Sequence, residues 1–365
     1  MVLPDYEHSI LNVTATLLKH YQAKTEYKSL PILEEALKEK RHVVLVLLDG
    51  MGINVLYKHL FKDAFLLRYL KEVITSVFPP TTVAATTTVL SGLPPYATGH
   101  LGWVQYFPKE DTNVAIFPNQ DFYESSKTMN FNFRDRYLKY PSIYEQIKRG
   151  TPSVSLNELF PNFREDGYAS FKDQVDRVID ITRTKEKSFT YVYWTEPDLT
   201  QHQYGIDAYE TRRVLYDLDQ EVERMAFFVS RGTTIVVIAD HGLIDVQEVP
   251  IYDNQQIMDM LRRKPSIEAR ATNFFVKKNQ LNQFKELFEA TYGKHFMLLS
   301  KQEVLDKKLF GEGKKHKMLD HFLGDFISIA TSNQMMSLSP DKPFVAHHAG
   351  LTKDELEVPL IIFSK

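Results

Sequence analysis

The sequence contains no cysteine among its 365 residues. This absence excludes disulfide bonds, zinc sites built from thiolates and a cysteine nucleophile. There is also little excess of charge, because 44 basic and 47 acidic residues leave a formal net charge of −3. Without a basic surplus, a nucleic-acid polymer is not an expected partner.

Long apolar stretches are missing as well. No run of 18 apolar residues occurs, so we expect no membrane-spanning helix. The opening MVLPDYEHSILNVTATLLKHYQ contains early acidic residues and lacks the apolar segment of a signal peptide. We therefore expect no membrane partner and a cytoplasmic location.

The residues that are present are typical of a soluble globular enzyme, with 43% hydrophobic and 25% charged residues. The chain is long for one domain, which favours a core domain with an insertion. We predict a first core segment at residues 1–248, an inserted cap at 249–342 and a return to the core at 343–365.

Three short apolar runs are rich in β-branched or aromatic residues. They are HVVLVLLDG at 42–50, SFTYVYWTEPD at 188–198 and TTIVVIADHG at 233–242. Nearly continuous apolar character is typical of strands buried on both faces of a parallel sheet. A fourth run, VPLIIFSK at 358–365, is consistent with a closing strand.

Helical patterns lie between these runs, at 9–21, 54–62, 81–90, 171–183 and 208–231. Alternation of strands and helices predicts an α/β fold with a doubly wound, mostly parallel sheet flanked by helices. The segment 249–342 has a different pattern. A strand is indicated by ATNFFVK, a helix by LNQFKELFEATYG, and two further strands by HFMLLS and DFISIAT. An exposed loop is indicated by KKLFGEGKKHK. This region is interpreted as a small α+β cap.

Each of the three core runs ends in an aspartate: Asp49, Asp198 and Asp240. Ligands of open α/β sheets bind beyond the carboxyl ends of the strands, where these side chains would gather. A single aspartate at such a place is more often a helix cap. Three carboxylates together would repel one another unless cations or protons compensate, so independent capping is a poor explanation.

Two histidines accompany these aspartates. Asp198 and His202 are four residues apart, which places them on one face of a helix that starts at Pro197. His241 directly follows Asp240. Either pair alone is more often a surface feature, but together the carboxylates and imidazoles favour a site for Zn²⁺, Mn²⁺ or Fe²⁺.

The segment FPPTTVAATTTVLSG concentrates threonines behind a Pro-Pro step. One interpretation is a capped turn that leads into a buried helix. The other is a nucleophile, because Thr81 and Thr82 would lie at a helix start, where free N–H groups bind anions and metal coordination activates a hydroxyl. The threonines at 86–88 are expected to pack or to bond back along the helix, without a function of their own.

These motifs resemble those of the alkaline phosphatase superfamily, most closely its type I phosphodiesterase/nucleotide pyrophosphatase branch. The family pattern DG…FP-x-x-T…TG is similar to DG…FPPTT…SG here, and EPDxxxH and DHG are matched by EPDLTQH and DHG. The segment AHHAGLTKDELEVPL is similar to HGGLTxxExxVPL of the superfamily's phosphomutases. The resemblance covers about 41–102, 188–245 and 345–365.

The resemblance implies two metal ions, commonly zinc, with a threonine nucleophile between them on an alkaline phosphatase-like core. Counting back from Gly92 selects Thr82 rather than Thr81 as the nucleophile. One metal would be held by Asp49, Thr82, Asp240 and His241, and the other by Asp198, His202 and His348, with His347 as the alternative to His348. A sulfatase is disfavoured, because a threonine occupies the position of the modifiable cysteine or serine.

The implied function is a hydrolase that cleaves phosphodiester or pyrophosphate bonds of small, nucleotide-like phosphate esters through a phospho-threonine intermediate. A phosphomutase or phosphomonoesterase is the alternative. Three cap residues, Arg262, Arg263 and Arg270, are available to bind a phosphate that a mutase retains, although solvation at the surface is the more common role of such residues. A non-catalytic binding protein is a third possibility that no residue favours. Four aromatic residues either pack the core or cover an ester group in the cleft: Trp103, Tyr106, Phe107 and Tyr204.

Overall fold

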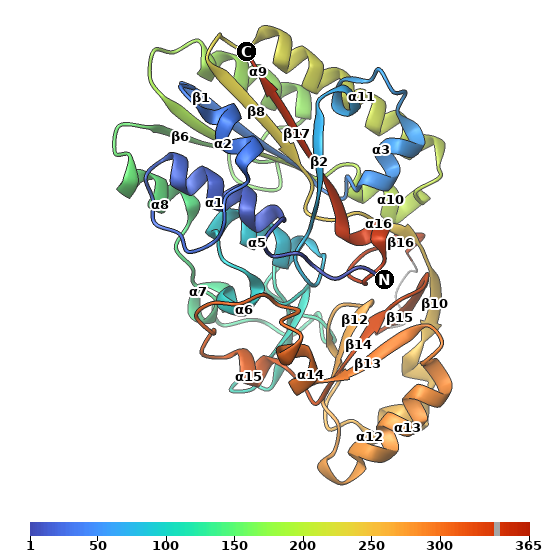
Figure 1. Cartoon of the computed structure of the whole chain (residues 1–365). Helices are drawn as coiled ribbons and strands as arrows, with labels where there is room; N and C mark the ends of the chain where they lie inside the picture. The colour runs from blue at the N-terminus through green and yellow to red at the C-terminus, as the bar shows by residue number, and fades with distance from the viewer. Residues whose placement is uncertain (339–343) are drawn as a thin grey trace.

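The chain forms two lobes, each built around its own β-sheet (Figure 1). The computed structural model describes residues 1–338 and 344–365. The predicted boundary between cap and core, at 342–343, lies outside these residues. Within the described part, no helix combines the length and the apolar character needed to cross a bilayer.

The upper lobe contains a six-stranded sheet in the order β2-β17-β8-β1-β7-β6. Its centre consists of the three predicted runs, β1 (His42–Leu48), β7 (Ser188–Trp194) and β8 (Thr233–Ile238). They pair in parallel, as does β6 (Ser155–Leu159) with β7. Every residue of β1 is buried, which explains its unbroken apolar sequence. The predicted doubly wound, mostly parallel sheet is confirmed.

The closing run forms β17 (Glu357–Ser364), but its direction is opposite to that of the central strands. It pairs antiparallel with β8 on one side and with β2 (Leu70–Thr75) on the other. In the described chain, the one reversed strand of this sheet is therefore β17, and the edge strand β2 runs in the same direction as the central strands.

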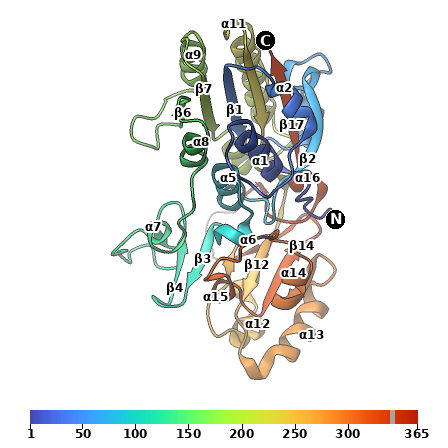
Figure 2. The ribbon, with the colours of Figure 1, turned by 60° about the vertical axis from the view of Figure 1, so that its left-hand side comes forward.

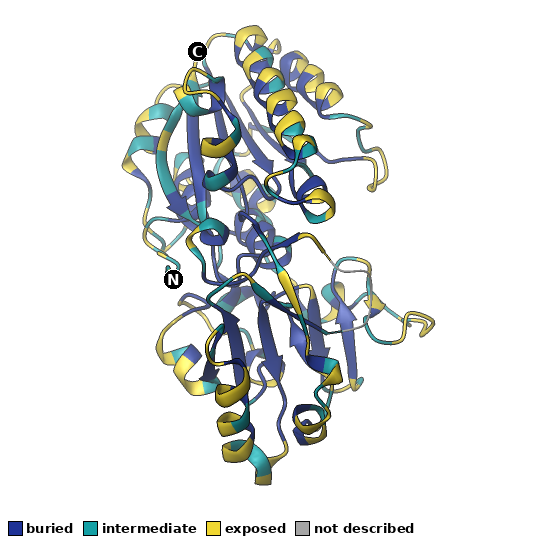
Figure 3. Cartoon of the chain, turned by 90° about the vertical axis from the view of Figure 1, so that its right-hand side faces the viewer, coloured by how far each residue is buried: buried dark blue, intermediate teal, exposed yellow. Residues whose placement is uncertain are grey.

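Helices form two groups that cover the two faces of this sheet (Figures 1 and 2). One group, whose members contact one another, comprises α1 (Ile10–His20), α5 (Thr82–Ser91) and α8 (Ile143–Gly150). The other comprises α3 (Ile53–His59), α9 (Phe171–Thr182) and α11 (Tyr209–Phe228). Buried residues gather in the strands and on the inner helix faces (Figure 3).

The lower lobe has a seven-stranded sheet in the order β13-β14-β12-β11-β3-β4-β5. The predicted cap elements are present as β12 (Ala271–Phe274), α13 (Leu281–Tyr292), β13 (Phe296–Ser300) and β14 (Phe326–Ala330). The same sheet also contains β3 (Val104–Phe107), β4 (Thr112–Ala115) and β5 (Gln120–Asp121), which lie in the segment assigned from the sequence to the core.

The two parts of the lower sheet meet where β11 (Ser266–Ile267) pairs with β3 through Ile267 and Val104. The second lobe is therefore assembled from two segments of the chain rather than from residues 249–342 alone. The loop at 307–317 also differs in part from its prediction. Its lysines are exposed, but Leu309 and Phe310 are buried, and the Phe310 ring lies 5.4 Å from that of Phe78.

Candidate active site

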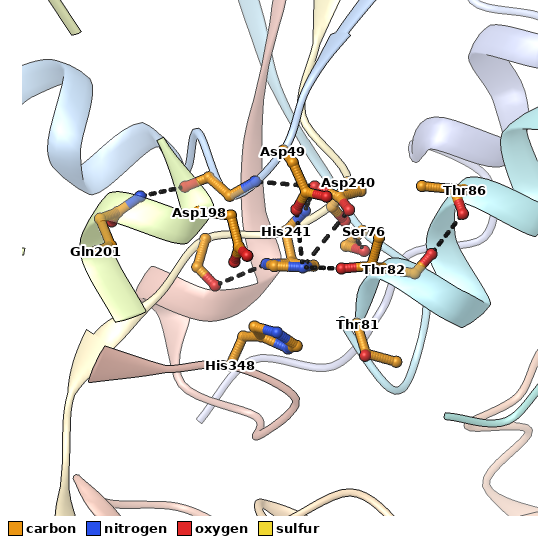
Figure 4. A network of polar contacts seen from close by, with 12 residues as sticks. Asp49, Ser76, Thr81, Thr82, Thr86, Asp198, Gln201, Asp240, His241 and His348 are labelled. Carbon is orange, nitrogen blue, oxygen red and sulfur yellow. Dashed lines mark hydrogen bonds and ion pairs between the residues drawn. The ribbon is translucent and has the colours of Figure 1, made fainter. Parts of the chain in front are cut away.

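The predicted site residues come together between the lobes, at the carboxyl ends of β1, β7 and β8 (Figure 4). Asp49 directly follows β1, and Asp240 and His241 follow β8. Asp198 is the first residue of α10 (Asp198–Tyr204), and His202 lies one turn further along it. His348 follows the short strand β16 (Ala346–His347).

Three of these residues form a buried set, here named the Asp49 group: Asp49, Asp240 and His241. Each offers a ligand atom within 4.8 Å of the others. Nε2 of His241 lies 3.5 Å from Oδ1 of Asp49 and 3.5 Å from Oδ2 of Asp240. The donors converge on one point, which is the arrangement that a cation requires.

Hydrogen bonds fix the two carboxylates through one oxygen each. Oδ1 of Asp240 accepts from the backbone N–H of Gly50 and from that of His241, both at 3.0 Å. The Tyr193 hydroxyl donates to Oδ2 of Asp49. The other oxygens, Oδ1 of Asp49 and Oδ2 of Asp240, are buried without a hydrogen-bond partner among the described residues.

Gly50 is required at this place for two reasons. Its φ of +71° lies in the left-handed region, and a Cβ there would stand 2.8 Å from the Cα of Asp198. The close approach lets the strand end of β1 contact the start of α10.

A second set, the Asp198 group, consists of Asp198, His202 and His348, again with ligand atoms within 4.8 Å of one another. Nδ1 of His202 lies 2.7 Å from the carbonyl oxygen of Ala346, so it carries the proton and Nε2 is left for a metal. Nε2 is 3.4 Å from Oδ1 of Asp198. Oδ1 of Asp198 and Nδ1 of His348 are buried without hydrogen-bond partners in the described chain.

The electrostatics of the protein without metal ions match this geometry. Burial raises the pKa of Asp198 to about 7 and raises that of Asp49 well above its ordinary value, and repulsion from Asp240 adds to both shifts. Burial lowers the pKa of His202 to about 4 and lowers that of His348, so both imidazoles are neutral. Neutral imidazoles and crowded carboxylates are the donors of a divalent cation site.

The donor sets therefore fit the two metal ions that the sequence implies. Four of the buried polar atoms that lack a hydrogen-bond partner among the described residues belong to these two groups. Such atoms are costly unless an ion or water satisfies them. Oxygen and nitrogen donors without sulfur suit zinc, manganese or iron.

The two candidate threonines have different environments. Thr82 is the first residue of α5, and its Oγ1 lies 3.2 Å from Nε2 of His241. Thr81 is the N-cap residue, and its hydroxyl donates instead to Oε1 of Glu268 in the second lobe, at 2.6 Å. Of the two threonines, only Thr82 therefore contacts the Asp49 group. Thr86 and Thr88 donate back to the carbonyls of Thr82 and Ala84, as expected.

The two adjacent histidines after β16 also differ. The His348 ring stacks on that of His241, and His348 is the one whose nitrogen joins the Asp198 group. Nδ1 of His347 accepts from the backbone N–H of His348 at 2.9 Å. His347 thereby braces the turn in which Ala349 has a φ of +92°.

The cap arginines considered for phosphate binding have other partners. Arg270 is fully buried and forms a two-point ion pair with Glu355. Arg262 pairs with Asp325, and Arg263 stacks over the Tyr106 ring at 4.0 Å. None of the three contacts the Asp49 or Asp198 group in the described chain.

The four aromatic residues divide evenly. Tyr106 and Phe107 are buried in the second lobe, whereas Trp103 and Tyr204 are 38% and 47% exposed. Two further residues of the site were not found from the sequence. Tyr193 could have been found, because the alternation of side chains along β7 places it on the same face of the sheet as Asp49, to which it donates a hydrogen bond. Nothing in the sequence marks Glu268.

Comparison with known proteins agrees with this arrangement. The profile of the type I phosphodiesterase/nucleotide pyrophosphatase family matches residues 43–349. Human ectonucleotide pyrophosphatase/phosphodiesterase 5 superposes with a TM-score of 0.68 at 14% identity, over 88% of this chain and 87% of that one. An inactive form of the murine protein in complex with AMP gives 0.66 at 16% identity, over 88% and 87%.

A bacterial enzyme has the same fold. Phosphonoacetate hydrolase from Sinorhizobium meliloti 1021, in complex with phosphonoformate, superposes with a TM-score of 0.64 at 16% identity, over 89% of this chain and 90% of that one. The family profile spans most of the chain, and the strand ends carry two acid–histidine groups beside a threonine. The chain belongs to the type I phosphodiesterase/nucleotide pyrophosphatase family, within the alkaline phosphatase superfamily, and is a hydrolase of that type.

Proposed function

We propose that the protein cleaves phosphodiester or pyrophosphate bonds at a two-metal site, through a phosphorylated Thr82. The observation that carries the proposal is the position of the Thr82 hydroxyl, 3.2 Å from His241 at the start of α5 and beside two acid–histidine groups. The Asp49 group would hold one cation and the Asp198 group the other, and we expect zinc. Bound there, the cations would stabilise the Thr82 alkoxide and neutralise charge on the attacking and leaving oxygens.

The chain's own residues supply the geometry of the reaction. Oγ1 of Thr82 attacks phosphorus while the bond to the ester oxygen breaks, and that oxygen departs with the bonding electrons and takes up a proton. The first turn of α5 has backbone N–H groups without helical partners, which bind the phosphoryl oxygens. Water then attacks phosphorus, the bond to Thr82 breaks, and the phosphate monoester is released.

The test is a comparison of two threonines on the same helix. Thr82→Ala should abolish turnover of bis-(p-nitrophenyl) phosphate while metal content stays near that of the wild type, and Thr82→Ser should retain activity. Thr86→Ala, one turn along, is the matched control and should behave as the wild type. Acid quenching during turnover, followed by peptide mass spectrometry, should locate phosphate on Thr82. Turnover by the Thr82→Ala variant near the wild-type rate contradicts the proposal.

We propose small, nucleotide-like phosphate esters as substrates. Support comes from the exposed rings of Trp103 and Tyr204, which are available to stack on a base or an aryl ester. The murine relative binds AMP, which is the same class of ligand. A phosphomutase is less well supported, because the three cap arginines have partners away from the site. The cytoplasmic location stays a prediction.

A further inference from the structure

One buried carboxyl group beside the nucleophile has no part in the mechanism above. Glu268 lies in the turn between β11 and β12 of the second lobe and is 5% exposed. Its Oε1 accepts two hydrogen bonds, from the Thr81 hydroxyl at 2.6 Å and from the backbone N–H of Trp103 at 2.7 Å. The carboxyl group is therefore held by the residue that directly precedes Thr82.

The turn that carries Glu268 is itself constrained. The Thr272 hydroxyl donates to the Glu268 carbonyl at 2.9 Å, and the Glu268 N–H donates to the Ala271 carbonyl at 3.1 Å. Both bonds of the side chain converge on Oε1, and Oε2 has no hydrogen-bond partner among the described residues. One carboxyl oxygen of Glu268, beside Thr81, is therefore left without a hydrogen bond in the described chain.

The charge around Glu268 is uncompensated by protein. No arginine or lysine in the described part of the chain forms an ion pair with it or with the aspartates of the two groups. Burial, together with a smaller contribution from the charge of Asp198, raises the pKa of Glu268 to about 7. Glu268 is thus close enough to Asp198 for the two carboxylates to repel each other.

We propose that Glu268 is a specificity residue, whose carboxylate beside Thr81 favours substrates with a singly charged phosphoryl group over those with a doubly charged one. This inference rests on the proposed function, because it takes Thr82 as the point of attack. A phosphoryl group attached to Thr82 brings its oxygens next to Thr81, and a second negative charge there is repelled by Glu268. Diesters carry one charge at phosphorus, and monoesters at neutral pH carry two.

The test removes the negative charge of Glu268 while keeping the two hydrogen bonds that its side chain accepts. In Glu268→Gln the amide oxygen still accepts from Thr81 and Trp103, so folding and diester turnover should change little. The ratio of kcat/KM for p-nitrophenyl phosphate to that for bis-(p-nitrophenyl) phosphate should rise about tenfold. Measurements at about pH 8.5 keep the wild-type carboxylate ionised. Glu268→Asp moves the carboxylate away from Thr81, so the ratio of monoester to diester kcat/KM should rise, but by less than in Glu268→Gln. This variant provides the test if the glutamine variant does not fold.

Two controls separate charge from structure. Thr81→Val removes one hydrogen bond but keeps the carboxylate, so it should slow both substrates equally and leave the ratio unchanged. Asp121→Asn removes a buried charge elsewhere in the same sheet and should also leave it unchanged. A ratio that is unchanged in Glu268→Gln, or shifted as much in Thr81→Val, overturns the inference.

Failure of the inference about Glu268 can be distinguished from failure of the proposed function. If Thr82→Ala loses both activities and Glu268→Gln leaves the ratio unchanged, only the role of Glu268 fails. If Thr82→Ala retains activity, the proposed function fails, and the inference about Glu268 fails with it.

Discussion

His241 and His348 stack face to face, with ring centroids 3.8 Å apart and ring planes 29° apart. His241 belongs to the Asp49 group and His348 to the Asp198 group, so the two groups are in direct contact through these rings. His241 also contacts Thr82. Thr82, the proposed nucleophile, therefore contacts the Asp49 group, whose histidine is stacked on that of the Asp198 group.

The first prediction concerns metal stoichiometry. Asp198→Asn or His202→Ala should each remove about one metal equivalent, and Asp49→Asn or Asp240→Asn the other, because each cation depends on three side-chain donors. Metal content of the purified variants, measured by mass spectrometry, gives the answer. His321→Ala changes an exposed histidine and should retain both ions. Loss of both ions from every variant would mean that the contact between His241 and His348 couples metal binding at the two groups.

Metal analysis can also decide whether His348 or His347 is the histidine ligand contributed to the Asp198 group from the segment after β16. His348→Ala should lose the metal of the Asp198 group, whereas His347→Ala should keep it, because only His348 contributes a nitrogen to that group. The reverse result would assign the ligand to His347.

The second prediction is a pH dependence of the metal-free protein. Burial raises the pKa of Asp198 to about 7 and raises that of Asp49, whereas both ionise near about 4 in an unfolded chain. Between these values the two carboxyl groups bind more protons in the folded state than in the unfolded state, so they contribute a loss of stability as the pH rises from about 4 to about 7. Bound cations remove this penalty, because they favour the ionised carboxylates.

The measurement is a pair of melting curves, with zinc and with a chelator, at about pH 5 and about pH 8. The difference in Tm between the two forms should be larger at the higher pH. An equal or smaller difference at the higher pH would mean that the aspartates are not the source of the effect. His202 should not contribute to the difference between the two forms, because burial lowers its pKa to about 4 and it is neutral in the folded protein at both pH values.

The third prediction concerns the buried ion pair between Arg270 and Glu355. Nε of Arg270 lies 2.6 Å from Oε1 of Glu355, and Nη2 lies 2.7 Å from Oε2. Removing one partner leaves a buried charge, so Arg270→Met should lower the free energy of unfolding by about 3–5 kcal/mol. Glu355 also accepts from the Gly350 N–H at 2.7 Å, close to His348, so the variant should bind the second metal more weakly.

Denaturant titration and metal analysis of the same preparation test both parts. Glu35→Gln breaks the exposed pair with Lys38 and serves as the control, with no measurable change expected. If Arg270→Met is as stable as the wild type, the pair does not hold the second lobe to the loop of His348.

The fourth prediction concerns the charge of the substrate. Diester hydrolysis should exceed monoester hydrolysis, because no arginine or lysine of the described chain pairs with the site carboxylates to offset a second phosphoryl charge. A panel of bis-(p-nitrophenyl) phosphate, p-nitrophenyl phosphate, a thymidine 5′-aryl phosphate and an aryl phosphonate provides the comparison. A higher kcat/KM for p-nitrophenyl phosphate than for the diester, at equal metal loading and pH, would be incompatible with it.

Much of the upper lobe can be predicted from local sequence. The runs that form β1, β7 and β8 are continuously apolar because they are buried on both faces, and their helices have clear periodicity. The direction of β17 cannot be predicted in this way, because an apolar strand can pair either way. The contribution of residues 104–121 to the lower sheet was also out of reach, since it depends on the pairing of β3 with a strand more than a hundred residues away.

The sequence by itself determined the parts of the site that are neighbours along the chain. Asp240 and His241 are adjacent, Asp198 and His202 are one helical turn apart, and backbone geometry alone keeps each pair together. Only the tertiary structure decided what joins these pairs: the parallel pairing of β1 with β8, the stacking of His348 on His241, and the contact of Glu268 with Thr81. Those contacts depend on packing between distant segments, and local sequence carries no signal for such packing.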